Sequence, residues 1–117
     1  MAWLVRDGKV LATLELAETH RDRRRGLLGR DSLEGALLLR PAKMIHTVRM
    51  RFPLDVAYLD ANLTVIKLHS IPRNRLTLPV LRSHAVLETE QGVMRSWGLT
   101  IGDRLEVRGA WDGSTGD

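Results

Sequence analysis

The sequence contains no cysteine, which excludes disulfide bonds, zinc–thiolate sites and thiol nucleophiles. Aromatic residues make up only 4% of its 117 residues, so the core must be built mainly from aliphatic side chains. No run approaches the length of a membrane-spanning helix, and the first residues show no signal-peptide pattern. We therefore expect a cytoplasmic protein that does not cross a membrane and has no membrane as a partner.

The remaining composition is that of an ordinary globular protein, with 44% hydrophobic and 27% charged residues. A chain of this length suits a single domain, which we assign to residues 1–111. The last residues, 112–117, have the sequence DGSTGD, which is typical of a flexible tail.

Apolar runs separated by turn residues predict a series of short strands. The pair Asp7-Gly8 between two such runs predicts a hairpin, because its turn needs positive φ at both central residues. Many short strands of this kind tend to curl into a strongly bent or barrel-like sheet. The expected strands cover residues 3–6, 9–16, 36–39, 54–59, 63–71, 85–90 and 104–111.

One main helix is predicted near residues 20–28. Thr19 is suited to cap its N-terminus through the side-chain hydroxyl, and Gly29 is suited to end it. Residues 92–97 are expected to form only one short helical turn. The expected fold class is therefore α+β, a β-rich single domain with one main helix.

Several motifs resemble a known family in their order along the chain. They are THRDRRRGLLGRDSLEG, ALLL, IHTVRMRFPLDVAYLD, HAVLETEQG and GLTIGDRL. Together they span about residues 10–108 and resemble the bacterial and archaeal family called domain of unknown function 192. This resemblance implies a small β-rich domain with no settled activity.

The positions that match the family pattern include many turn residues. They are Gly26, Leu27, Arg30, Pro53, Leu54, Asp55, Asp60, Glu88, Gly92, Gly102 and Asp103. Where this chain has Ile45, His46 and Thr47, another branch of the family carries an aromatic segment of the FWM type. This difference from the resembling family argues against His46 as a catalytic group that the family shares.

His46 and Asp55 are candidates for a general base and the carboxylate that orients it, as in a hydrolase. The alternative is a structural role for both residues. A single histidine in a strand is typically a hydrogen-bonded structural residue, and a buried carboxylate needs a partner. The sequence offers Arg30 and Arg51 as partners of Asp55.

We expect no metal and no cofactor. The histidines are scattered along the chain, and no pair has the spacing that places two ligands on one helix face. A nucleophile elbow and a phosphate-binding glycine loop are also missing from the sequence. The histidines are His20, His46, His69 and His84.

Arginines are concentrated in the predicted helix, where Arg21, Arg24 and Arg25 share one face. They are candidates for a phosphate site, and the alternative is a solvated helix surface. Because aromatic residues are few, we expect only weak, non-specific nucleic-acid binding.

The preferred interpretation is a small binding module for an anionic molecule or partner, because arginines gather near the expected strand ends. The candidate ligand-binding residues are His46, Arg49, Arg51, Asp55, Arg73 and Arg75. One alternative is a hydrolase-like enzyme that uses His46 and Asp55. Another is a protein-interaction module that uses a sheet edge. We expect a monomer or a weak dimer.

Overall fold

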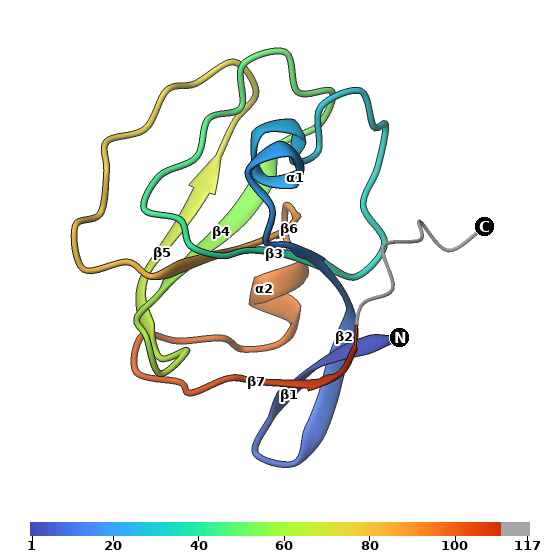
Figure 1. Cartoon of the computed structure of the whole chain (residues 1–117), viewed down its shortest axis with the longest axis vertical. Helices are drawn as coiled ribbons and strands as arrows, with labels where there is room; N and C mark the ends of the chain where they lie inside the picture. Colours follow the sequence, from blue (N-terminus) through green and yellow to red (C-terminus); the bar gives the residue numbers. More distant parts are fainter. Residues whose placement is uncertain (111–117) are drawn as a thin grey trace.

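The computed structural model describes residues 1–110 and contains one sheet with two short helices, α1 (His20–Arg25) and α2 (Val93–Ser96) (Figure 1). The strands follow the order β5-β4-β6-β3-β2-β1-β7 across the sheet. The β2–β3 pair is parallel, and the other pairs are antiparallel. The strands are β1 (Ala2–Arg6), β2 (Lys9–Ala17), β3 (Ala36–Leu39), β4 (Leu54–Leu59), β5 (Val65–Ile71), β6 (Ala85–Glu90) and β7 (Glu106–Gly109).

The local turn chemistry explains the first hairpin. Asp7 and Gly8 both have positive φ, at 51° and 78°, as the tight turn between β1 and β2 requires. The predicted strands at 36–39, 54–59 and 85–90 are confirmed with the same bounds. The last strand is shorter than predicted within the described residues, and both Trp111 and the predicted tail at 112–117 lie outside them.

Each face of the sheet carries its own hydrophobic cluster, because side chains alternate along a strand. On β4, Ala57 and Leu59 belong to the cluster that contains Met94 of α2. Val56 and Tyr58 belong to the other cluster, which contains Leu27 just after α1. Figure 1 likewise shows the two helices on opposite sides of the central strands.

The sheet curls but does not close. An isolated bridge between Thr64 and Arg104 joins the segments that precede the two edge strands, β5 and β7. The amide of Leu105 also donates to the carbonyl of Leu63 at 2.9 Å. These contacts join two short segments rather than two strands, so the barrel-like form that we predicted is not confirmed.

Helix α1 begins where the sequence predicts and ends earlier. The hydroxyl of Thr19 accepts a hydrogen bond from the Asp22 amide at 3.0 Å, which confirms the predicted cap. The helix then stops at Arg25 rather than at residue 28, because Gly26 takes positive φ and donates its amide to Asp22. Leu27 is therefore buried from a turn rather than from the helix.

Two irregular segments, 40–53 and 72–84, lie side by side over the α1 side of the sheet. The amide of Thr47 donates to the carbonyl of Arg75 at 2.9 Å, and that of Val80 donates to Lys43 at 2.8 Å. His46 and Leu76 form an isolated antiparallel bridge between them. Among the described residues, the helices are too short to cross a bilayer.

Candidate functional site

The central strands carry two buried carboxyl groups, Asp55 on β4 and Glu88 on β6. They are 6% and 4% exposed. Glu88 is paired with Val56, the residue after Asp55, so the two acidic side chains lie close in the sheet but on opposite faces. Asp55 faces α2, and Glu88 faces the side that carries α1.

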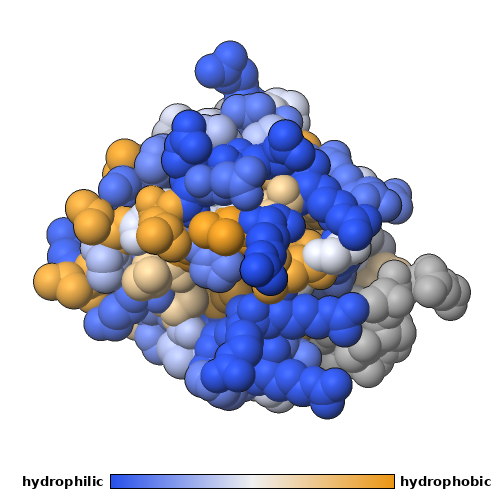
Figure 2. Space-filling view, turned by 90° about the horizontal axis from the view of Figure 1, so that it is seen from above, coloured by the Kyte–Doolittle hydropathy of each residue, from blue (hydrophilic) through white to orange (hydrophobic). Residues whose placement is uncertain are grey.

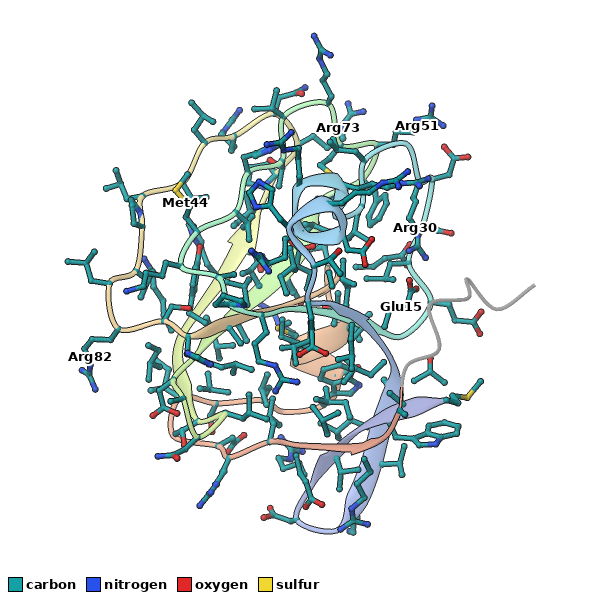
Figure 3. All side chains as sticks on the ribbon, viewed as in Figure 1. Glu15, Arg30, Met44, Arg51, Arg73 and Arg82 are labelled. Carbon is teal, nitrogen blue, oxygen red and sulfur yellow. The ribbon has the colours of Figure 1, made fainter. Side chains whose placement is uncertain are left out.

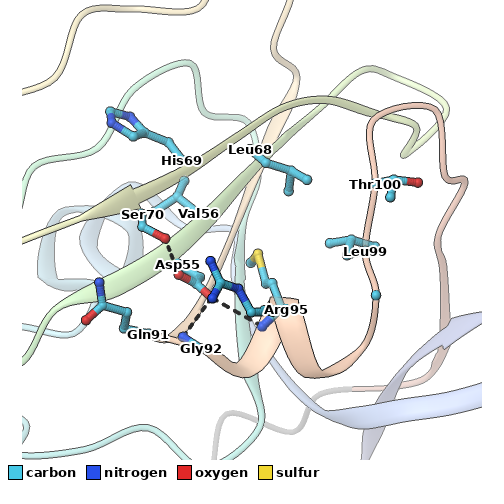
Figure 4. Close-up of a pocket in the computed structure, with 12 residues that line it drawn as sticks. Asp55, Val56, Leu68, His69, Ser70, Gln91, Gly92, Arg95, Leu99 and Thr100 are labelled. Carbon is cyan, nitrogen blue, oxygen red and sulfur yellow. Dashed lines mark hydrogen bonds between the residues drawn. The ribbon is translucent and has the colours of Figure 1, made fainter.

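The carboxylate of Asp55 is fully engaged with hydrogen-bond donors (Figure 4). One oxygen accepts from the hydroxyl of Ser70 on the neighbouring strand at 2.7 Å. The other accepts from the amides of Gly92 and Met94 at 2.9 and 3.3 Å. Asp55 therefore caps α2 from a distant part of the chain, and the negative charge suits the positive end of the helix.

Neither arginine suggested by the sequence is the partner of Asp55. Arg30 makes two hydrogen bonds to Glu15, both at 2.9 Å, and the two side chains point toward each other in Figure 3. Arg51 pairs with Asp31 at 2.8 Å on the surface. The predicted arginine partners were wrong because the loop after β6 brings backbone amides to Asp55 instead.

A cavity of about 540 Å³ lies beside Asp55. Figure 4 shows Asp55 and Ser70 turned toward each other and toward the loop at Gly92. Because both oxygens of Asp55 already accept hydrogen bonds, this carboxylate has little capacity left for a ligand. The wider lining consists of Val56, Leu68, His69, Gln91, Met94, Arg95, Gly98, Leu99 and Thr100.

A second cavity, of about 210 Å³, lies on the other face, and we call it the Glu88 pocket. Glu88 of β6 lines it together with residues of α1. The segment that contains His46 contributes further lining residues. The lining residues are Arg23, Arg24, Arg25, Gly26, Leu27, Leu28, Leu39, Met44, Ile45, His46, Met50 and Glu88.

The electrostatic state of Glu88 differs from that of an ordinary glutamate. Burial raises the pKa of Glu88 from 4.5 to about 8, and no hydrogen bond or charge among the described residues offsets that burial. The carboxyl group is therefore mostly protonated at neutral pH, and it can donate a hydrogen bond into the pocket.

Arginines of α1 line the same pocket. Arg24 and Arg25 are exposed and Arg23 is half-buried, and all three residues line the pocket. Arg23 donates to the carbonyl of Glu18 at 2.7 Å, and Arg24 lies 3.3 Å from the ring of His20. Within residues 1–110 none of the three forms an ion pair with an acidic side chain.

The structure does not bring the predicted site residues together. His46 lines the Glu88 pocket, whereas Asp55 lies on the opposite face, so the proposed base–carboxylate pair does not form. Arg75 lines a third cavity beside Tyr58. Arg51 and Arg73 point outward from the surface in Figure 3, and Arg49 is also exposed.

Sequence reasoning missed Glu88 as a site residue. A usable signal was present in the run AVLETE, where a glutamate occupies the middle of a strand whose other residues are mostly apolar. A carboxyl group in that position must be buried if both faces of the strand are covered. Groups of three or more metal-ligating side chains are not found within residues 1–110.

Comparison with known proteins supports the family and the fold. The family model of domain of unknown function 192, described as "Uncharacterized ACR", matches residues 2–107. Among curated proteins, none matches the chain significantly. A crystal structure from Sinorhizobium meliloti 1021, described as a "putative transcription regulator", is 24% identical over 91% of each chain, with a TM-score of 0.77.

A second solved structure is a protein of unknown function from Novosphingobium aromaticivorans DSM 12444. It is 25% identical, with a TM-score of 0.74, over 90% of this chain and 82% of that one. Both relatives therefore share this fold. Because the family model covers nearly the whole chain, the protein belongs to the domain of unknown function 192 family.

Proposed function

We propose that the protein is a small binding module whose ligand is a small anionic molecule that enters the Glu88 pocket. The observation that carries this proposal is a largely buried glutamate that lines a cavity and whose carboxyl group makes no side-chain hydrogen bond within residues 1–110. Buried polar groups are almost always hydrogen-bonded, so a carboxyl group that borders a cavity without such a bond is suited to accept a partner from a ligand.

The residues around Glu88 define the chemistry of that partner. Protonated Glu88 offers one hydrogen-bond donor to an acceptor oxygen of the ligand. The arginines that line the pocket offer charge-assisted hydrogen bonds to an anionic group. Leu39, Ile45 and Met50 supply apolar contacts between these two ends. A short carboxylate or phosphate ester with a small apolar body fits this set.

The size of the pocket limits the ligand further. At about 210 Å³ it is smaller than the roughly 300–1,000 Å³ that is usual for drug-sized ligands. We therefore propose a compact metabolite rather than a nucleotide or a peptide.

Three further features belong to the same proposal. The protein acts in the cytoplasm, which the absence of cysteine permits. It functions as a monomer or a weak dimer. The description of the Sinorhizobium protein concerns transcription, but we propose only weak, sequence-independent nucleic-acid binding here, because an arginine-rich helix without aromatic platforms favours non-specific contacts.

Methionine methyl groups provide a direct test, because they report on the two cavities separately. Met50 lines the Glu88 pocket and Met94 lines the cavity beside Asp55. In a protein with ¹³C-labelled methionine methyl groups, acetate, butyrate, benzoate or methyl phosphate should shift the Met50 signal and leave Met94 in place. The uncharged butyramide should have little effect.

Matched variants identify the contribution of charge. Arg24→Gln with Arg25→Gln should weaken binding roughly tenfold or more, because charge-assisted hydrogen bonds are lost. Arg21→Gln is the control, since Arg21 lies on the same helix but does not line the pocket. Binding should also weaken as the pH rises through about 8, where Glu88 ionises and repels an anion.

Several results would overturn the proposal. If none of the anions shifts Met50 at millimolar concentrations, the pocket is not a site for this class of ligand. If butyramide binds as well as butyrate, the charge of the ligand is not recognised. If the anions shift only the Met94 signal, they bind in the cavity beside Asp55 and not in the Glu88 pocket.

A further inference from the structure

The loop between β5 and β6 exposes leucines and buries polar residues. Leu76, Leu78 and Leu81 are 78%, 84% and 77% exposed. In the same loop Ser83 is only 2% exposed, and the hydroxyl of Thr77 donates to the carbonyl of Ile45. This arrangement is the reverse of the usual one, in which leucine is buried and serine is exposed.

The geometry of the loop keeps these leucines outside. The amide of Ser83 donates to the carbonyl of Val80 at 2.9 Å, so Leu81 and Arg82 occupy the corner of a tight turn. Ser83 also donates its hydroxyl to the carbonyl of Ala42 at 2.9 Å. Because the inward-facing residues of the loop are hydrogen-bonded to the body, its leucines are held outward.

The exposed leucines belong to a larger apolar surface. Segment 42–47 is hydrogen-bonded to the loop, and its Met44 is 47% exposed. Figure 2, which shows the molecule from above, has hydrophobic side chains gathered on its left side and bordered by hydrophilic ones. We define the leucine surface as Met44, Leu76, Leu78 and Leu81.

Cations lie beside the leucine surface. Lys43 donates to the carbonyl of Leu81 at 3.0 Å, and Arg82 follows Leu81 directly. In Figure 3, Arg82 and Met44 lie on the same side of the molecule. Within the described part of the chain, none of the three nearby cations forms an ion pair. These cations are Lys43, Arg75, which lines a cavity with Leu76 and Leu78, and Arg82.

The same region contains no acidic residue to neutralise them. Residues 35–54 and 61–87 include no aspartate or glutamate, although they make up both segments that build this surface. A second copy of the chain would bring cations against cations, which disfavours self-association through this surface. The fitting partner is therefore a surface that is both negatively charged and able to receive apolar side chains.

We propose that the leucine surface docks onto an anionic lipid bilayer. Its leucines project separately from a loop rather than lining a groove, and a bilayer accepts such side chains without a complementary shape. Basic residues beside them are attracted by the negative potential of anionic lipids. The docking is peripheral and leaves the fold unchanged.

Vesicle binding by the full chain tests the proposal. The protein should bind vesicles of phosphatidylcholine with phosphatidylserine at least roughly tenfold more tightly than vesicles of phosphatidylcholine alone. Higher salt should weaken this binding, because it screens the charges. Equal binding to both kinds of vesicle would overturn the role of charge.

The variant Leu76→Ser, Leu78→Ser and Leu81→Ser should lose roughly tenfold or more of the affinity for anionic vesicles. Its thermal melt should match that of the unmodified protein, because these side chains are exposed. The control is Val10→Ser with Ile101→Ser, two exposed apolar residues outside this surface, which should bind as before. If the leucine variant binds as tightly as the control, the proposal is wrong.

Other occupants give distinct outcomes in parallel measurements. Leucine-dependent dimerisation in sedimentation equilibrium would identify a second copy as the partner instead. Binding to soluble poly-glutamate as tight as binding to anionic vesicles would indicate an acidic protein. Competition by millimolar inorganic phosphate would indicate recognition of a headgroup alone, and each of these three results overturns docking on a bilayer.

Discussion

Asp55 and Glu88 occupy almost the same level of the sheet, on paired strands, and both are buried. Asp55 faces a turn whose backbone amides point at it, and it accepts three hydrogen bonds. Glu88 faces a cavity and takes a proton instead. The difference comes from what the fold places opposite each carboxyl group.

This contrast separates a structural carboxylate from an available one. Donors that belong to the protein occupy both oxygens of Asp55 and tie α2 to the sheet. Within residues 1–110 Glu88 has no such donors, so its hydrogen-bonding capacity is open to a ligand. Burial alone therefore does not identify a functional acid, and the presence or absence of internal donors does.

The largest expected effect is the pH dependence of stability that Glu88 causes. The pKa of Glu88 is raised from 4.5 to about 8 on folding, so the folded state binds the proton more tightly. The free energy of unfolding therefore keeps the full contribution of Glu88 below pH 4.5, where both states are protonated. It falls as the pH rises from 4.5 through about 8, by a total of about 5 kcal/mol.

Glu88→Gln isolates this effect, because glutamine is neutral at every pH. Urea denaturation from pH 5 to 9 should show the unmodified protein losing stability relative to Glu88→Gln as the pH rises. An identical pH dependence for the two proteins would mean that Glu88 is ionised in the folded state, and the contrast with Asp55 would fail.

The next largest effect is expected for Asp55→Asn. The NH₂ group of asparagine would face one of the existing N–H or O–H donors, which then has no acceptor. A buried hydrogen-bond acceptor would be lost. The free energy of unfolding should fall by about 2–3 kcal/mol, measured by thermal or urea denaturation.

The matched control for this prediction is Asp31→Asn. Asp31 pairs with Arg51 on the surface, where its side chain is 83% exposed. The control should change stability by less than about 1 kcal/mol. If Asp55→Asn loses no more stability than Asp31→Asn, Asp55 is not structural. It then becomes the first residue to study as a ligand site.

The smallest effect concerns the caps of the two helices. Thr19 caps α1 from the adjacent residue, whereas Asp55 caps α2 from another strand. Thr19→Ala should cost about 1 kcal/mol, within a range of about 0.5–2 kcal/mol, as a local cap does. A loss as large as that of Asp55→Asn would show that α1 is tied to the sheet through Thr19 as well.

Much of the fold follows from local sequence signals. The Asp7-Gly8 turn, the Thr19 cap and the apolar runs at 36–39 and 85–90 each act over a few residues, and each is confirmed. The early end of α1 was missed because Gly26 competes with Gly29 as a terminator, and sequence alone does not show which one adopts positive φ for this purpose.

The sites were less predictable because they depend on contacts between distant segments. The partners of Asp55 come from residues 15 to 39 positions away, and two of them are backbone amides that any residue supplies. The Glu88 pocket joins α1, β6 and the segment around His46. A pattern within a few residues does not predict contacts between such distant segments. A glutamate inside an apolar strand nevertheless indicates a candidate site residue.

The most direct test of the contrast is a titration of the Glu88 carboxyl group itself. In protein labelled with ¹³C at the glutamate side-chain carboxyl, Glu88→Gln identifies the signal by its loss. The account predicts a midpoint near 8 for Glu88. A midpoint near the ordinary value of 4.5 would contradict it, because Glu88 would then titrate like a glutamate in water despite its burial.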